Sequence, residues 1–526
     1  MSLNTSSNER TPQPEGEHFD VLIVGAGISG IGAACELRRQ CPNKTFLVLD
    51  ALESFGGTWL WHKYPGIRSD SDLFTFGFRF KPWLGAPIAS GAEILKYLGE
   101  AIEENDLGGH IRYGHRIEHA AWDNATRTWT LTALRAVDGA RLSFTCNFLW
   151  MCQGYYRHAK GYTPAWPGMS DFQGEIIHPQ TWPESLDYKD KRVVVIGSGA
   201  TAATVVPAIA ADCQHVSLLQ RSPTYFSPGQ NRHWLADTLR ELNIDETWIH
   251  DIVRRKIVHD QNKFLRRSIE EPDAAKAELL KGVLKYLPQD IVDKHFTPSY
   301  RPWQQRIAVV PDGDLFECVR SGKVSVATDT IERFTKTGLL LNSGEKLDAD
   351  IIITATGFDI CVLGDIAFEI DGAPLNFADT VTYRGMMFTG APNMAWVFGY
   401  FRAASWTLRV DMVSDFVCRL LNHMDRRGVR KVEVALRPED ANMELLPWID
   451  DAVFNPGYLK RGMHLLPKRG NKPEWAHSQD YWWERDVLPY VDLDDTALIY
   501  DDGAGGEEAA SPSKSRAQAN EPRDRS

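Results

Sequence analysis

The sequence predicts an α/β fold in which two strand–turn–helix units of the same type are separated along the chain by other elements. Three observations predict it. An apolar run, a glycine-rich turn and a helical segment occur in that order near residue 20 and again near residue 193. Residues 230–295 carry apolar side chains at helical spacing and few glycines, which is typical of a helical insertion. The 526 residues, 43% of them hydrophobic, suffice for several domains with their own cores.

The first unit reads FDVLIVGAGISGIGAACELRRQ and contains the turn Gly25-x-Gly27-x-x-Gly30. Gly25 permits a tight turn, Gly27 lets a pyrophosphate approach the backbone, and Gly30 allows close helix–strand packing. The helix N-terminus then presents free N–H groups to the phosphates. We therefore expect a dinucleotide to contact Gly25, Gly27, Ser29 and Gly30.

A second apolar run, residues 45–49, ends at Asp50. A carboxylate at this point can accept hydrogen bonds from ribose hydroxyls. An acid at the ribose suits FAD, so the first unit is predicted to bind FAD.

The second unit, VVVIGSGATA, contains Gly197-x-Gly199-x-x-Ala202, where alanine is an accepted small residue at the third position. The following apolar run ends on Arg221 and Ser222 instead of an acid. A guanidinium can bind a 2′-phosphate that a carboxylate would repel. The second unit is therefore predicted to bind NADPH, through Gly197, Ser198, Gly199, Ala200, Thr201, Ala202, Arg221 and Ser222.

Two such units predict two Rossmann-like dinucleotide-binding domains whose cofactors exchange a hydride. A third apolar run, residues 349–359, is expected to lead the chain from the NADPH unit back to the FAD unit. The predicted division is a disordered leader 1–18, an FAD domain 19–155 and 385–501, an NADPH domain 156–228 and 318–384, a helical insertion 229–317 and a disordered tail 502–526.

Composition excludes several classes of protein. The net charge of −12 disfavours binding to nucleic acid. Eight cysteines without a Cys-x-x-Cys pair disfavour a disulfide scaffold, a zinc ribbon and a dithiol reductase, and we predict no metal site. No secretory signal and no apolar run of membrane-spanning length is visible, so we expect a cytoplasmic protein without an integral membrane segment. The oligomeric state stays open.

Two longer strings indicate a family. Residues 172–183, FQGEIIHPQTWP, resemble at every fixed position the fingerprint of type I Baeyer–Villiger monooxygenases, within the flavin-containing monooxygenase superfamily. Residues 56–70, GGTWLWHKYPGIRSD, resemble the second motif of that family. Shorter strings such as LQRSPTY, PWQQR and VPDGDLF are similar to its ethionamide-activating branch, and the similarity extends from about residue 19 to about residue 490.

The resemblance implies an NADPH- and O2-dependent enzyme that inserts oxygen beside a ketone carbonyl through a C4a-peroxyflavin, giving an ester or lactone. Thioether sulfoxidation is implied as a side activity. Arg306 and Asp70 match the active-site arginine and acid. A guanidinium that is always charged can stabilise a peroxide anion and then the developing oxyanion, while the carboxylate orients it. The further cofactor contacts implied are Gly57, Thr58, Trp59, Asp70 and Ile117 for FAD, and Arg68 and Ser69 for NADPH.

Two alternative functions remain open, and the sequence departs from the family pattern at several positions. A flavin-dependent N- or S-hydroxylase shares this fold, although the Trp182-Pro183 ending disfavours it; a non-catalytic redox-sensing flavoprotein is an alternative of another class. We expect His178 to position the linker between the domains by hydrogen bonds to backbone. Asp50 stands where relatives commonly have Glu. Residues 60–62 and 401–406 differ from the branch and are expected to border the substrate pocket, so the sequence does not name the ketone.

Overall fold

The computed structural model describes residues 16–501. Its first strand, β1, spans Glu17–Val24. The predicted leader was too long by two residues, because Glu17 and His18 pair with the strand β6 (Arg141–Met151). Residues 1–15 of that leader and the predicted tail 502–526 lie outside the described residues.

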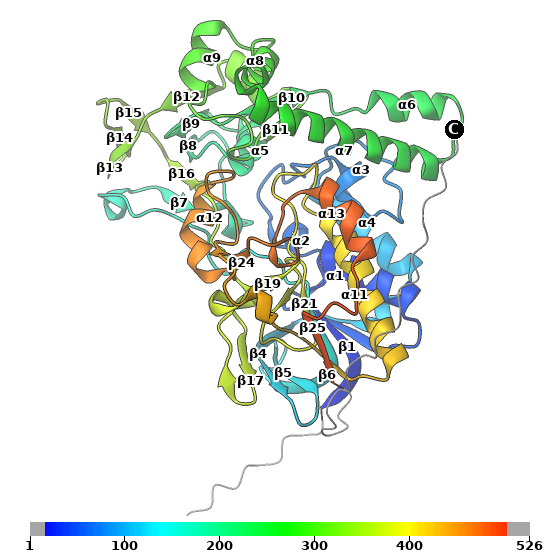
Figure 1. Ribbon diagram of the computed structural model, residues 1–526. Helices are drawn as coiled ribbons and strands as arrows, with labels where there is room; N and C mark the ends of the chain where they lie inside the picture. Colours follow the sequence, from blue (N-terminus) through cyan, green and yellow to red (C-terminus); the bar gives the residue numbers. More distant parts are fainter. Residues whose placement is uncertain (1–15, 502–526) are drawn as a thin grey trace, which may run out of the picture.

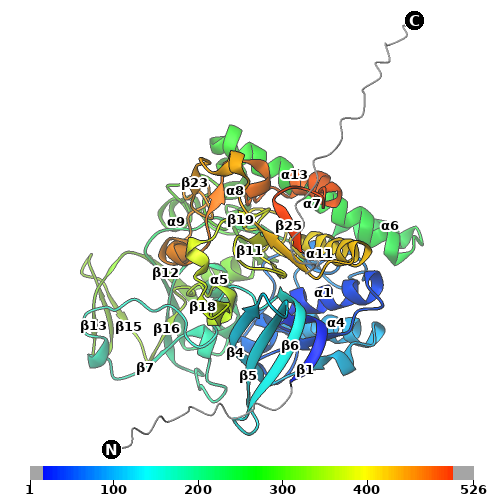
Figure 2. The same cartoon turned by 60° about the horizontal axis from the view of Figure 1, so that its bottom comes forward.

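The larger sheet has the strand order β18-β17-β4-β5-β6-β1-β2-β3, with β21 beside β6. Its centre is parallel, whereas β4, β5 and β6 form an antiparallel meander (Figure 2). The apolar run of β1 and all of β2 are buried, as expected for parallel strands covered on both faces. The other strands of this sheet are β2 (Phe46–Leu49), β3 (Ile111–Arg112), β4 (His115–Asp123), β5 (Thr128–Arg135), β17 (Ala367–Ile370), β18 (Ala373–Pro374) and β21 (Met394–Trp396).

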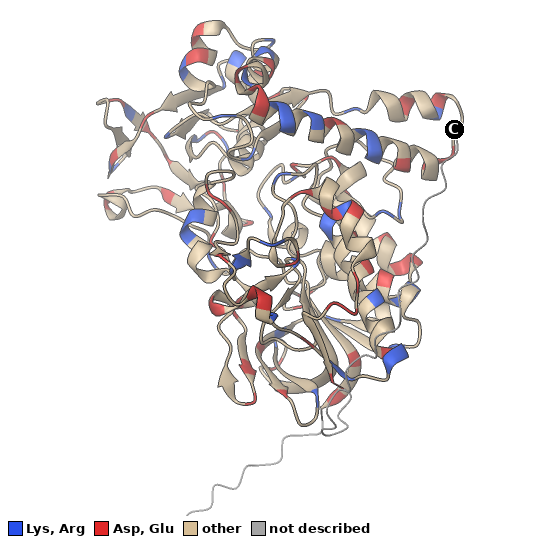
Figure 3. Cartoon of the chain, in the orientation of Figure 1, with Lys and Arg blue, Asp and Glu red and all other residues tan. Residues whose placement is uncertain are grey.

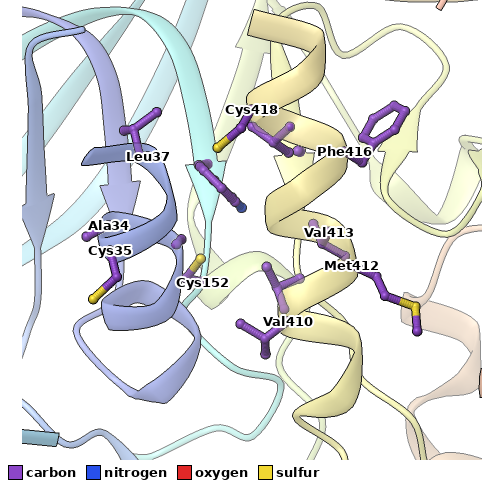
Figure 4. Packing of buried hydrophobic residues seen from close by; sticks show 14 of the residues in the cluster. Ala34, Cys35, Leu37, Cys152, Val410, Met412, Val413, Phe416 and Cys418 are labelled. Atoms are coloured by element: carbon purple, nitrogen blue, oxygen red, sulfur yellow. The ribbon is translucent and has the colours of Figure 1, made fainter. Parts of the chain in front are cut away.

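Helices α1 (Ile28–Gln40) and α11 (Leu408–Arg427) pack against each other beside this sheet (Figure 4). Small side chains permit the contact: a Cβ on Gly32 would lie 3.2 Å from a methyl carbon of Val410. Phe416 and Cys418 of α11 are completely or almost completely buried in the same core. Residues almost 400 positions apart in the chain therefore share one hydrophobic core.

The smaller sheet is parallel, with the order β12-β9-β8-β16-β7. The run predicted to lead the chain back to the first unit forms its strand β16, between β8 and β7. Helices α5 and α10 pack on this sheet, and a three-stranded sheet, β13-β14-β15, lies beside it (Figure 1). The strands are β7 (Glu175–Ile177), β8 (Arg192–Ile196), β9 (His215–Gln220), β12 (Val324–Thr328), β13 (Ile331–Thr335), β14 (Gly338–Leu341), β15 (Lys346–Asp348) and β16 (Ile351–Thr354), and the helices are α5 (Ala200–Ile209) and α10 (Asp314–Arg320).

One predicted boundary is wrong. Residues 318–384 were assigned to the second unit, but Ala367–Ile370 pairs in parallel with β4 of the larger sheet. The chain therefore returns to the first unit soon after β16 rather than at residue 384. No local pattern in the sequence distinguishes the two sheets that such a short strand can join.

The insertion is helical between residues 234 and 295, as the apolar spacing predicted. Strands β10 and β11 pair in parallel where the chain enters and leaves the insertion. Arg254 of α7 fastens the insertion to the first unit, since it donates to the carbonyls of Phe74, Thr75 and Gly77 and forms an ion pair with Asp411 at 2.8 Å. The elements are α6 (Trp234–Glu241), α7 (Glu246–Glu270), α8 (Pro272–Val283), α9 (Gln289–His295), β10 (Phe226–Gly229) and β11 (Ala308–Pro311).

Short elements complete the structure. They are α2 (Thr58–Trp61), α3 (Leu73–Phe76), α4 (Gly91–Glu104), α12 (Gly457–Gly462), α13 (Tyr481–Val487), β19 (Thr382–Tyr383), β20 (Met387–Phe388), β22 (Lys431–Val434), β23 (Leu445–Leu446), β24 (Arg469–Gly470) and β25 (Leu498–Asp501). Both acidic and basic residues lie along α7 (Figure 3). Within residues 16–501, no helix has both the length and the apolar character that crossing a membrane requires.

A buried ion pair joins α11 to α13. Arg409, with 0% of its side chain exposed, donates to Glu484, which is 2% exposed, at 2.8 Å. The same guanidinium donates to the carbonyls of Arg384, Gly385 and Phe398, so its desolvation is offset by several hydrogen bonds.

We expect Arg409→Leu to destabilise the protein by about 3–5 kcal/mol, because it leaves the buried carboxylate of Glu484 without its cationic partner. The measurement is the melting temperature followed by far-UV circular dichroism. Arg135→Ala is the control, because Arg135 pairs with Asp138 on the surface and its loss should leave melting unchanged. Equal melting of Arg409→Leu and wild type would contradict this account.

Candidate functional site

A single cavity of about 1360 Å³ lies where the two glycine-rich turns face each other. Nearly all the residues that the sequence singled out line it. They are Gly25, Gly27, Ser29, Asp50, Gly57, Thr58, Trp59, Arg68, Ser69, Asp70, Ile117, Gly197, Ser198, Gly199, Ala200, Thr201, Arg221, Ser222 and Arg306. Gly30 and Ala202 do not line it, and each instead packs its helix against the preceding strand.

Backbone crowding explains the glycines of the first turn. Gly25 has φ +105°, and a Cβ there would lie 2.6 Å from the carbonyl oxygen of Cys152. A Cβ on Gly30 would lie 1.8 Å from the Gly25 carbonyl oxygen, so only glycine lets α1 start so close to β1. Gly57 approaches the same turn: its Cβ would lie 3.2 Å from the Gly27 Cα. The backbones at Gly27 and Gly57, which carry no side chains, thus meet at the edge of the cavity, where a pyrophosphate can approach.

Asp50 ends β2 at the cavity. One carboxylate oxygen accepts the backbone N–H of Ala26 and the other accepts that of Leu52 at 2.8 Å. Burial raises the pKa of the carboxyl group, while these two hydrogen bonds oppose the rise. Each oxygen retains a lone pair, so the fixed carboxylate fits the role of ribose acceptor.

The second turn has the same crowding on one side and open space on the other. Gly197 has φ +135°, and a Cβ there would lie 2.2 Å from the Ala355 carbonyl oxygen. A Cβ on Gly199 would meet no atom of the described residues within 4 Å, although Gly199 precedes the first turn of α5 and lines the cavity. This vacant approach to a helix N-terminus fits a pyrophosphate.

Two arginines face the second turn in different ways. Arg221 follows β9, is exposed and lines the cavity. Arg68 forms an ion pair with Asp314 of α10 at 2.5 Å and donates to the Ala203 carbonyl at 3.3 Å. Arg68 thus links the motif at residues 56–70 to the smaller sheet's helices. Ser69 is 3% exposed, and its hydroxyl accepts the Ala89 N–H.

The structure brings Asp70 and Arg306 together. Arg306 Nε donates to the Asp70 carboxylate at 3.2 Å, and Nη2 donates to the Asp70 carbonyl at 3.3 Å and the Ser71 hydroxyl at 2.9 Å. Nη1 donates to the Phe401 carbonyl at 3.3 Å. The guanidinium is therefore fixed from three sides at the cavity wall.

Sequence reasoning missed four residues of the aromatic wall beside Arg306, whereas the fifth, Phe401, lies in a segment that was expected to border the substrate pocket. Tyr155, Tyr156, Phe401, Phe454 and Tyr458 all line the cavity. Phe401 stacks on Phe454 with centroids 5.4 Å apart, and Tyr155 lies 5.5 Å from Phe401. One signal was available: the tyrosine pair follows the end of β6 by a few residues, and ligands bind at the carboxyl ends of parallel strands.

The two segments expected to border the substrate pocket reach the cavity in part. His62, Phe401 and Trp406 line it, whereas Leu60 and Trp61 do not. His62 is buried, which lowers its pKa to about 4 and keeps the ring neutral. The indole N–H of Trp406 and His62 Nδ1 have no hydrogen-bond partner among the described residues, so polar atoms remain free at the cavity.

His178 is tied to backbone, as predicted. Its Nδ1 accepts the Gln180 N–H at 3.1 Å, so its Nε2 carries the proton that goes to the Gly357 carbonyl at 3.0 Å. Burial lowers the pKa of the ring. With both nitrogens engaged, His178 has no free base. It fastens the segment after β7 to the segment after β16.

These features define the class of protein. Two strand–turn–helix units with glycine-rich turns open onto one cavity, and a fixed arginine–carboxylate pair and an aromatic wall lie at the same cavity. The residues present fit two dinucleotides that approach each other, which is the arrangement of a two-dinucleotide oxidoreductase.

Comparisons with known proteins agree. A family model described as flavin-binding monooxygenase-like matches residues 88–365, and one described as an NAD(P)-binding Rossmann-like domain matches residues 23–82. The FAD-containing monooxygenase EthA of Mycolicibacterium smegmatis is 45% identical over 92% of this chain and 97% of its own. EthA of Mycobacterium tuberculosis H37Rv is 46% identical over 92% of this chain and 98% of its own.

Solved structures show the same fold. An oxidized steroid monooxygenase bound to NADP aligns with a TM-score of 0.72 at 22% identity, over 92% of this chain and 100% of its own. Cyclohexanone monooxygenase from Rhodococcus sp. Phi1 bound to NADP+ aligns with a TM-score of 0.65 at 21% identity, over 81% of this chain and 87% of its own. The chain belongs to the flavin-binding monooxygenase-like family, which confirms the family resemblance seen in the sequence.

The contrast between two glycines of the second turn gives a prediction. Gly199→Val should fold and melt like wild type, because its side chain enters open space, but it should raise KM for NADPH at least about tenfold by occupying the phosphate approach. Steady-state kinetics at varied NADPH measures this.

Gly197→Ala is the control, and it should instead lower the melting temperature, because its Cβ would collide with the Ala355 carbonyl. A Gly199→Val enzyme with unchanged KM would place the nucleotide elsewhere.

Proposed function

We propose that the protein is an NADPH- and O2-dependent Baeyer–Villiger monooxygenase. It binds FAD at the first turn and NADPH at the second. The reaction converts a ketone, O2, NADPH and a proton into an ester or lactone, NADP+ and water. Reduced FAD, when bound, supplies the activated oxygen. The observation that carries the proposal is the Asp70–Arg306 pair fixed at the cavity that both turns share.

Arg306 has one donor left for chemistry. A guanidinium has five N–H groups, and four of them go to Asp70 Oδ2, the Asp70 carbonyl, Ser71 and Phe401. The remaining N–H is on Nη1. A permanently charged donor whose orientation is already fixed stabilises an anionic oxygen without reorganising during the reaction.

Asp70 and Ser71 keep that orientation. The Ser71 hydroxyl accepts from Arg306 and donates to the other oxygen of Asp70 at 3.2 Å. The Asp70 carboxylate partly balances the guanidinium charge, which offsets the unfavourable desolvation of a partly buried charged group. The apolar rings of Phe401 and Phe454 restrict water on the same wall, which strengthens the electrostatic effect of the guanidinium.

The remaining cavity residues are assigned to the cofactors by position. We assign Gly25, Gly27, Ser29, Asp50, Gly57, Thr58, Trp59 and Ile117 to FAD and Arg68, Ser69, Gly197, Ser198, Gly199, Ala200, Thr201, Arg221 and Ser222 to NADPH. Gly30 and Ala202 act indirectly, by allowing their helices to approach. Thioether sulfoxidation at the same site is a proposed second activity, because it needs the same activated oxygen but no carbonyl.

Product analysis tests the function. The holoenzyme is incubated with NADPH, air and a panel of ketones, thioethers and amines, and products are identified by mass spectrometry. Esters or lactones from ketones support the proposal. Oxidation of amines alone would establish the N-hydroxylating alternative, and a flavoprotein that never oxidises NADPH in air would establish a redox sensor.

Cofactor preference gives a prediction at one residue. Arg221→Ala should lose about 1.5–3 kcal/mol of NADPH binding, tenfold to over a hundredfold in KM, because only NADPH carries a 2′-phosphate. KM for NADH should hardly change. Steady-state kinetics with both nucleotides measures this. Equal losses with NADH and NADPH would mean that Arg221 supports structure only.

Substitution of Arg306 should affect oxygen transfer to the ketone but not reduction of the flavin by NADPH. Arg306→Ala should retain FAD and still oxidise NADPH, but ester formation should fall by about 10²–10³-fold and hydrogen peroxide should take its place. The ratio of ester to hydrogen peroxide per NADPH measures the change.

Arg306→Lys should restore little, because an ammonium lacks the planar fork that reaches Asp70, Ser71 and Phe401 together. Ester formation by Arg306→Ala near the wild-type rate would overturn this role, as would simple loss of FAD.

A further inference from the structure

Gln479 holds the backbone segment that supplies one acceptor to Arg306. The carbonyl of Phe401, which accepts from Arg306 Nη1 at 3.3 Å, lies in the loop that follows β21. The Oε1 atom of Gln479 accepts the N–H of Phe401 at 2.6 Å, and its Nε2 atom donates to the carbonyl of Gly399 at 3.0 Å. One side chain therefore fixes both ends of the segment 399–401, and the catalytic role proposed above does not use it.

The partners of the Gln479 amide determine its orientation. The Nε2 atom also lies 2.8 Å from Nε2 of His477. Because Oε1 accepts a backbone N–H, Nε2 is the amino group of the amide, and the nitrogen of His477 is its acceptor. Burial lowers the pKa of His477 well below its ordinary value, so the ring stays neutral and keeps this acceptor. Turning the amide around would place two donors against each other at Phe401.

The backbone of Gln479 is itself held in place. Its φ is +53°, which a residue with a long side chain rarely adopts. The next residue, Asp480, accepts the first backbone N–H groups of α13. Helix α13 carries Glu484, the buried partner of Arg409, and Arg409 donates to the carbonyl of Phe398 at 3.0 Å. The start of α13 and the loop after β21 are therefore fixed to each other at two neighbouring points.

The Phe401 carbonyl determines the direction of the free N–H of Arg306. Nη1 carries two hydrogens; one goes to this carbonyl, and the other is the donor left for chemistry. Because the guanidinium is planar, the direction of the first N–H sets that of the second. A displacement of the Phe401 backbone therefore turns the free donor, and a displacement of about 1 Å is enough to impair catalysis.

We propose that Gln479 is a positioning residue that sets the direction of the free Arg306 N–H through the Phe401 carbonyl. The assignment rests on the proposed Baeyer–Villiger function, in which that N–H stabilises an anionic oxygen. Gln479 does not line the cavity, so its effect reaches the reaction through the backbone of residues 399–401.

The first test compares Gln479→Met with wild-type holoenzyme. Methionine has a similar length, but it neither accepts the N–H of Phe401 nor donates to Gly399. We expect kcat for ester formation to fall about tenfold and hydrogen peroxide per NADPH to rise, while KM for NADPH stays unchanged. Steady-state kinetics with quantification of both products measures this. An unchanged ratio of ester to hydrogen peroxide would overturn the proposal.

Asn393→Leu is the matched control. Asn393 is 0% exposed and has φ +46°, and its amide donates to the carbonyls of Asn147 and Arg430 and accepts the N–H of Val432. It does not line the cavity. Its loss should lower the melting temperature but leave the ratio of ester to hydrogen peroxide unchanged. An equal change of that ratio in both variants would contradict a specific role for Gln479.

A double substitution tests the route through Arg306. If Gln479 acts by orienting Arg306, Gln479→Met should change ester formation by less than about twofold in enzyme that already carries Arg306→Ala. A further loss of about tenfold would mean that the two residues act independently, and it would overturn the proposed route.

Amide hydrogen exchange tests the anchor without any product. In holoenzyme, peptides that cover residues 399–402 should exchange faster in Gln479→Met than in wild type, because the N–H of Phe401 loses its acceptor. Unchanged exchange there would contradict the proposal. Wild-type enzyme that forms no ester from any ketone would overturn the Baeyer–Villiger function itself, and that outcome is seen before any variant is measured.

Discussion

The guanidinium of Arg306 is the contact on which the geometry of the reaction site depends. It joins the loop at Asp70 and Ser71 to the backbone at Phe401, and it comes from the chain just before β11, at the root of the helical insertion. Three segments that are remote in sequence therefore converge on one side chain. A lysine could not satisfy three acceptors that lie on different sides, which is why the residue type matters as much as its charge.

Further contacts hold the two units in register around that point. Arg254 of α7 donates to carbonyls around α3 and pairs with Asp411 of α11, so the insertion is fixed to the first unit. Arg68 pairs with Asp314 of α10 in the second unit, although it belongs to the motif that also carries Asp70. His178 fastens the linker to Gly357. The relative position of the two phosphate sites is thus set by buried or half-buried polar contacts rather than by apolar packing alone.

The sequence predicted what is encoded locally. The glycine turns at Gly25 and Gly197 were found because a strand, a tight turn and a helix must follow one another within about ten residues. The boundary near β17 was wrong, because pairing of a four-residue strand depends on a distant sheet edge. Tyr458 was missed for the same reason: its meeting with Tyr156 is set by tertiary packing, and neither flanking sequence carries a spacing that signals it.

The central claim is that oxygen activated at this cavity is inserted beside a ketone carbonyl, and isotope labelling tests it most directly. The holoenzyme would be given NADPH, a ketone and heavy-isotope O2, and the product and NADPH consumption would be quantified together. The account predicts an ester or lactone carrying one labelled atom in its bridging oxygen for each NADPH consumed. Label that appears only in hydrogen peroxide and water, with the ketone unchanged across the panel, would contradict it.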